Sequence, residues 1–78
     1  MDKPGLNRVV IDEFDRLACL TPLEKNVLTT RAAGHCQYWQ SQKYSVSQAT
    51  ITRVVRRLQR KYDAVKSFSA ILPDDLII

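Results

Sequence analysis

The chain has 78 residues, a formal net charge of +4 and an apolar share of 45%. That length allows one domain, and that apolar share indicates a folded chain rather than a disordered one. Two glycines and three prolines signal few turns, and the short apolar runs predict neither a signal peptide nor a transmembrane segment, so we expect a cytoplasmic protein.

The first half of the sequence predicts two helices. Val10, Phe14 and Leu17 recur at helical spacing and indicate an amphipathic helix over residues 7–18. Thr21, Pro22 and Glu24 then form the start signal of a second helix, with a capping threonine, proline at the first position and glutamate at the third. We expect this helix to run over 22–33 and to stop at Gly34.

The next two helices form a predicted helix-turn-helix. A short helix is expected from residue 35 or 36 to 42, with one of Tyr38 and Trp39 in the core. Ser41 is the small residue at the helix crossing, whereas Gln40 stands where an apolar side chain is usual. Tyr44 and Val46 flank the turn, with Ser45 in place of the usual glycine. Ser47 caps a recognition helix over 47–62, whose apolar stripe is Ile51, Val54, Val55, Leu58 and Tyr62.

After Asp63 the helical period changes, and Pro73 stops any later helix. We therefore expect an all-α, compact four-helix domain over 1–66, followed by a short extended tail over 67–78. The tail is apolar enough to serve as a dimerisation segment. The residues expected to make that contact are Phe68, Ile71, Leu72, Leu76 and Ile77.

Positive charge is concentrated in the predicted helix-turn-helix and the residues around it. Residues 31–66 hold eight basic and one acidic side chain, whereas residues 1–30 hold four basic and five acidic ones. A basic block of this kind inside a nearly neutral domain is typical of a protein that binds a polyanion. Double-stranded DNA is the expected partner.

The outward side chains of the recognition helix have the chemistry needed to contact bases. Arginine binds O6 and N7 of guanine with two hydrogen bonds, and glutamine binds N6 and N7 of adenine in the same way. We predict base contacts from Gln48, Ala49, Thr52, Arg53 and Arg56. Phosphate contacts, which set the register on DNA, are predicted from Ser47, Thr50, Arg57, Arg60, Lys61, Lys43 and Arg31.

The sequence offers little support for catalysis or for a cofactor. Cys19 and Cys36 are interpreted as reduced, core or half-buried residues, since a cytosolic protein keeps its thiols reduced. His35 and Cys36 are adjacent, which is the wrong spacing for a zinc site or for a nucleophile and its base. We therefore predict no enzyme, no metal, no cofactor and no small-molecule ligand.

Several segments resemble known regulators. Residues 20–24, Val27-Leu28, Gly34, 46–51 and 60–62 resemble the LuxR/GerE-type DNA-binding domain. The same stretch, extended to the first helix and to residues 70–74, is similar to the TrfB/KorA plasmid repressors. Both resemblances imply a transcription regulator with its recognition helix at 47–62, and the second implies a repressor of a mobile element.

These patterns together predict a sequence-specific transcriptional regulator. It is expected to be a repressor that binds an inverted-repeat operator as a homodimer. The alternative is a protein-binding module with the same fold, acting on RNA polymerase, a sigma factor or another regulator.

Overall fold

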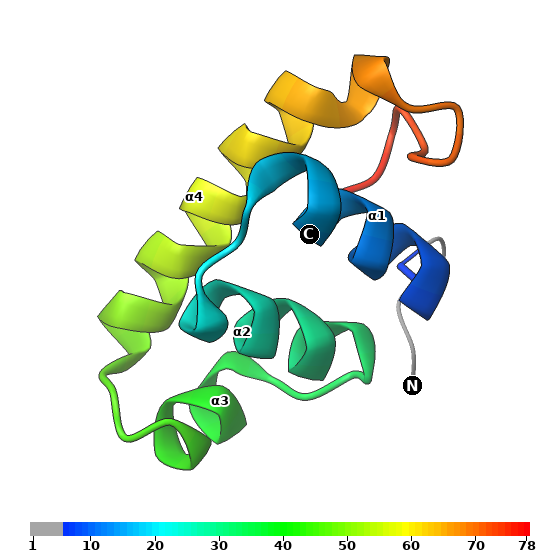
Figure 1. Cartoon of the computed structure of the whole chain (residues 1–78). Coiled ribbons are helices and arrows are strands. Elements are labelled where there is room, and N and C mark those ends of the chain that lie inside the picture. The colour runs from blue at the N-terminus through cyan, green and yellow to red at the C-terminus, as the bar shows by residue number, and fades with distance from the viewer. Residues whose placement is uncertain (1–5) are drawn as a thin grey trace.

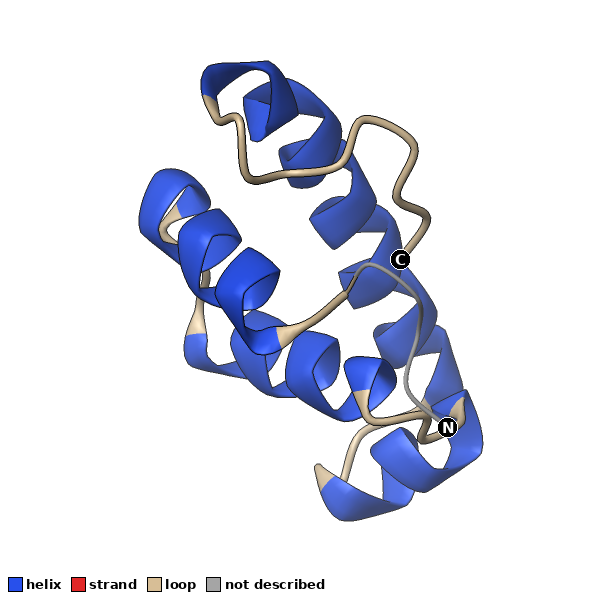
Figure 2. Cartoon of the chain, turned by 90° about the vertical axis from the view of Figure 1, so that its right-hand side faces the viewer, coloured by secondary structure: helices blue, strands red, loops and turns tan. Residues whose placement is uncertain are grey.

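Residues 6–78 form an all-α domain of four helices, as predicted. The computed structural model describes residues 6–78, so residues 1–5 of the predicted domain lie outside the described part. The helices are α1 (Arg8–Ala18), α2 (Pro22–Ala32), α3 (Gln37–Lys43) and α4 (Gln48–Val65), followed by a short 3-10 turn, η1 (Lys66–Phe68). No strand occurs among residues 6–78 (Figure 2).

Side-chain caps set where the helices begin. The carboxamide of Asn7 accepts a hydrogen bond from the Val10 amide at the start of α1. Thr21 and Glu24 make the predicted reciprocal capping box of α2, and the Ser47 hydroxyl accepts from the Thr50 amide at the start of α4. Each cap satisfies backbone N–H groups that a helix leaves free, which contributes about 1 kcal/mol.

The predicted stop of α2 at Gly34 is confirmed. Gly34 has a φ of 94°. Glycine adopts this conformation at little energetic cost because it has no Cβ atom. Its amide donates to the carbonyl of Arg31, and the His35 amide donates to that of Thr30, at 3.0 and 3.1 Å. This pair of bonds is a Schellman motif, which turns the chain sharply toward α3.

Helix α4 is the element on which the other helices pack. Figure 1 shows α4 along one edge of the molecule, with α1, α2 and α3 all packed on the same side of it. Ile51, Leu58 and Tyr62 are fully buried, and the ring of Tyr62 meets that of Phe14 edge-on with centroids 5.2 Å apart. Such a pair contributes roughly 0.5–1.5 kcal/mol beyond the burial of its area. One face of α4 is therefore committed to the core and the opposite face is free.

The helix predicted to end at Tyr62 continues to Val65. Val65 extends the apolar stripe beyond Tyr62 and packs against the core, although it is only partly buried. The prediction stopped too early because Asp63, Ala64 and Lys66 dilute the apolar pattern at this point. Packing, not local propensity, determines where this helix ends.

The C-terminal segment folds back onto the same core. Leu72, Leu76 and Ile78 are buried with the helix residues. Tyr62 Oη donates to the Pro73 carbonyl at 2.5 Å, and Gln59 Oε1 accepts from the Ile78 amide at 2.9 Å, so the last residues run alongside α4 (Figure 2). The expectation that Leu72 and Leu76 offer a dimer contact is therefore wrong, because their side chains complete the core of their own chain.

Two further expectations about burial are wrong. Cys19 and Cys36 are both exposed free thiols: Cys19 ends α1 with a φ of 52°, and Cys36 caps α3. Tyr38 and Trp39 are both exposed, while Gln40 and Ser41 supply the buried face of α3. Gln40 takes this place because its Nε2 donates to the Val27 carbonyl and to the Thr30 hydroxyl, at 2.8 and 3.0 Å, which offsets part of the cost of burying an amide.

Candidate nucleic-acid interface

A tight turn joins α3 to α4 and completes a helix-turn-helix. Ser45 has a φ of 55°, the left-handed conformation in which glycine is usual and serine is strained. The Val46 amide donates to the Ser41 carbonyl at 3.0 Å and closes the turn. Ser41 is buried, as expected for the small residue at the crossing, and Tyr44 and Val46 pack against the core.

The outer face of α4 carries a stripe of arginines. Ala49, Arg53, Arg56 and Arg60 follow one another at intervals of four, three and four residues, which places them on one side of a helix with 3.6 residues per turn. All four are exposed. None of the three arginines has an ion-pair partner among residues 6–78. We call Arg53, Arg56 and Arg60 the arginine stripe.

The residues at the start of α4 divide between this outer face and α3. Gln48 is exposed, as the predicted base contact requires. Thr52 is half-buried instead: its hydroxyl accepts a hydrogen bond from Gln37 Nε2 at 2.7 Å, and the same nitrogen donates to the Gln48 carbonyl at 2.8 Å. The expectation that Thr52 faces outward with the arginines is therefore corrected. Gln37 is a residue that the sequence analysis missed, because its partners become neighbours only when the turn closes.

The residues predicted to contact phosphate lie in different surroundings. Ser47 and Thr50 use their hydroxyls in the cap of α4, where their oxygens lie 3.0 Å apart. Lys43, at the end of α3, is exposed and has no ion-pair partner in the described part of the chain. Arg31 Nε donates to the carbonyl of Ile78 at 2.8 Å and so secures the C-terminal segment. Arg31 therefore has a structural partner that the sequence analysis did not anticipate.

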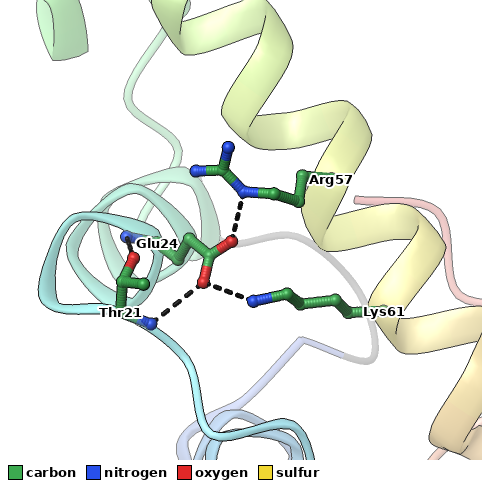
Figure 3. A network of polar contacts seen from close by, with 4 residues as sticks. All are labelled: Thr21, Glu24, Arg57 and Lys61. Carbon is green, nitrogen blue, oxygen red and sulfur yellow. Dashed lines mark hydrogen bonds and ion pairs between the residues drawn. The ribbon is translucent and has the colours of Figure 1, made fainter.

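The remaining two, Arg57 and Lys61, bind one buried carboxylate. Glu24 at the start of α2 is fully buried, with Oε2 2.5 Å from Arg57 Nε and Oε1 2.8 Å from Lys61 Nζ. The Thr21 amide donates to the same Oε1 at 2.9 Å (Figure 3). The sequence predicted Glu24 as half of a capping box, but the cations lie 33 and 37 residues farther along the chain. We call Glu24, Arg57 and Lys61 the Glu24 cluster.

The acidity of Glu24 follows from these contacts. Burial alone raises the pKa of a carboxyl group, because it removes water from the charged form. Hydrogen bonds from Lys61, the Thr21 amide and Arg57 outweigh that effect and lower the pKa of Glu24 from 4.5 to about 2. The Glu24 carboxylate is therefore charged at neutral pH and links α2 to α4 through ion pairs.

Other kinds of site find little support in this structure. No group of three or more His, Cys, Asp and Glu side chains within residues 6–78 is arranged to hold a metal ion. Across the same residues, no helix combines the length and hydropathy that a membrane span needs. A cavity of about 470 Å³ lies between α1 and α2, away from the arginine stripe, and is lined by Leu6, Asn7, Arg8, Ile11, Asp12, Lys25, Thr29, Ala32 and Ala33.

Comparisons with protein-family models, with curated proteins and with solved structures each find no match. The resemblance to two families of regulators therefore stays a prediction. What the chain does has to be inferred from its own residues.

The Glu24 cluster predicts a specific loss of stability in acid. A carboxyl group whose pKa is lower in the folded chain stabilises the fold above its unfolded pKa of about 4.5, and this contribution disappears as the pH falls through about 2. Because Arg57 and Lys61 are partly exposed, we expect about 2 kcal/mol rather than the full value that the shift implies.

Urea denaturation of the wild type and of Glu24→Gln between pH 7 and pH 2 measures this contribution. The difference in unfolding free energy should be largest at pH 7, shrink below about pH 4.5 and approach zero near pH 2. A difference that stays constant over this range would show that Glu24 acts through packing and not through its charge.

Proposed function

We propose that the protein is a sequence-specific DNA-binding transcriptional regulator that places α4 in the major groove. The arginine stripe is the observation that carries this proposal. A single α-helix fits the width of the groove, and its unpaired arginines have the geometry to bind guanine edges and phosphates. Arg53 and Arg60 are seven residues apart and so about 10 Å apart along the axis of α4. The stripe therefore spans a few base steps.

The two halves of α4 have separate tasks in this proposal. Gln48, Ala49, Arg53 and Arg56 contact base edges, because recognition helices of this type enter the groove N-terminus first. Arg60, farther along the stripe, contacts phosphate, as do Lys43 and the caps Ser47 and Thr50 from the turn side. We infer that the protein is a cytoplasmic repressor of the kind found on plasmids, from its resemblance to the TrfB/KorA family.

The test is DNA binding measured by fluorescence anisotropy over a salt series. The probes are a duplex enriched from a randomised pool by the wild type and a scrambled duplex of the same composition. Arg53→Ala should reduce the preference for the enriched duplex by about 1–3 kcal/mol, because one base contact is lost. Arg8→Ala, which removes an equal charge from a 94% exposed side chain on α1, should leave that preference unchanged.

Equal losses in the two variants would mean that only net charge matters. Failure to enrich any sequence, with weak and equal binding of all duplexes, would contradict the proposed sequence-specific function.

We also propose that the regulator binds DNA as a homodimer, which matches the two-fold symmetry of an inverted repeat. Val9, Phe68 and Ile71 are 63%, 77% and 50% exposed. Ser69 Oγ donates to Glu13 Oε2 at 2.9 Å, which brings the segment around Phe68 and Ile71 against the face of α1 that carries Val9. Phe68 and Ile71 thus stay in the expected contact with a second copy, Val9 is added to it, and the buried Leu72 and Leu76 are removed from it.

Sedimentation equilibrium from one to one hundred micromolar tests the homodimer. The wild type should show a monomer–dimer equilibrium. The double variant Phe68→Ser, Ile71→Ser should be monomeric, because it lacks the apolar area that drives association. Tyr38→Ser, which alters an aromatic side chain on α3 that is 54% exposed, should leave the equilibrium unchanged. A wild type that is monomeric throughout would contradict the proposed dimer.

One observation favours the alternative function, a protein-binding module. His35 and Trp39 stack with ring centroids 3.7 Å apart and interplanar angle 8°, and both are exposed on the α3 side of the molecule together with Tyr38. Exposed aromatic residues are enriched at protein interfaces. If no duplex binds even at low salt, this aromatic surface on α3 becomes the candidate contact with a protein partner.

A further inference from the structure

The five cations of α4 fall into two groups that differ in electrostatic environment. Those of the arginine stripe have no ion-pair partner among residues 6–78. Arg57 and Lys61 share the carboxylate of Glu24, so the three side chains together carry one positive charge instead of two. The charge that α4 presents to a polyanion is therefore smaller than its sequence suggests.

Because Glu24 is buried, its carboxylate neutralises part of the charge of Arg57 and Lys61 with little screening by salt. The carboxylate is fully buried, whereas the side chains of Arg57 and Lys61 are 47% and 32% exposed. Ion pairs with a buried partner are screened less by salt than pairs between two exposed groups. The hydrogen bond from the Thr21 amide also holds the carboxylate at the first turn of α2, so that it cannot follow the cations into solvent (Figure 3).

We propose that Glu24 restrains non-specific binding of DNA by holding Arg57 and Lys61 against α2. This inference rests on the proposed DNA-binding function. Non-specific affinity comes from the number of phosphates that free cations neutralise, whereas base contacts add only to specific affinity. Glu24 thus lowers non-specific affinity by reducing the number of free cations, and it does so without touching DNA itself.

This role differs from a purely structural one in the sign of its effect. A residue that only stabilises the fold would, when replaced, weaken binding to every duplex or leave it unchanged. Loss of an electrostatic restraint instead strengthens binding to scrambled DNA and steepens its dependence on salt.

The experiment compares Glu24→Gln with Asp12→Asn on a scrambled duplex between 50 and 300 mM salt. Both variants remove one negative charge, but Asp12 pairs with Arg8 on α1 and contacts no cation of α4. Glu24→Gln should bind about three- to tenfold more tightly at 100 mM salt. Its log–log salt slope should be steeper by about 0.9 for each cation released, so by up to about 1.8. Asp12→Asn should change affinity less than twofold.

A second pair of variants keeps the test valid if Glu24→Gln does not fold, which circular dichroism will show. Arg60→Gln and Lys61→Gln each remove one cation from adjacent positions of α4, and Glu24 keeps Arg57 as a partner in both. Arg60→Gln should reduce the salt slope by about 0.9, and Lys61→Gln by less than half of that.

Equal salt slopes for Glu24→Gln and Asp12→Asn, or equal reductions in the second pair, would overturn the restraint while leaving DNA binding intact. A wild type that binds no duplex with a measurable salt dependence would instead overturn the proposed function itself.

Discussion

The buried carboxylate of Glu24 is the constraint on which the arrangement of α4 depends. A charged group in the interior is costly unless its hydrogen bonds are satisfied, and here the partners come from its own cap and from α4. Both oxygens are used: one by Arg57, the other by Lys61 and the Thr21 amide. Because the two cations must reach one point at the start of α2, α4 is held at a single rotation about its axis. That rotation directs the arginine stripe away from the core.

Apolar contacts explain how so short a chain can present a strongly basic helix. Three unpaired arginines on one face repel one another, and that repulsion opposes folding. Three apolar features offset this cost: the apolar stripe on the opposite face of α4, the ring contact between Phe14 and Tyr62, and the C-terminal segment, which packs against the same core. The small core thus depends on residues from both ends of the chain, since Leu6 and Ile78 both belong to it.

Much of the fold could be predicted from the sequence, because its local signals agree with one another. Apolar periodicity and the caps at Thr21, Gly34 and Ser47 locate the helices to within a few residues. The prediction failed where burial depends on contacts between distant segments. Nothing local indicates that Gln40 is buried while Trp39 is exposed, because the Val27 carbonyl and Thr30 hydroxyl that satisfy Gln40 come from α2. For the site, spacing placed Arg53 and Arg56 on the outer face of α4, but it grouped Arg57 with Arg60 as phosphate contacts. The partner that distinguishes Arg57 from Arg60 is Glu24, which lies on another helix.

The proposed contact with DNA consists of the outer face of α4, the turn before it and Lys43, and it excludes α1 and the C-terminal segment. Titration of ¹⁵N-labelled protein with an enriched duplex, followed by amide and arginine Nε–Hε chemical shifts, tests it most directly. The largest changes should fall in the turn 44–47, the first half of α4 and the side chains of the arginine stripe. The amide chemical shifts of α1 and of residues 68–72 should change little on addition of DNA. Changes there that also occur without DNA, when the protein concentration is raised, report the dimer contact instead. Shifts centred on α3 or on the C-terminal segment, with the arginine stripe unaffected, would contradict the claim.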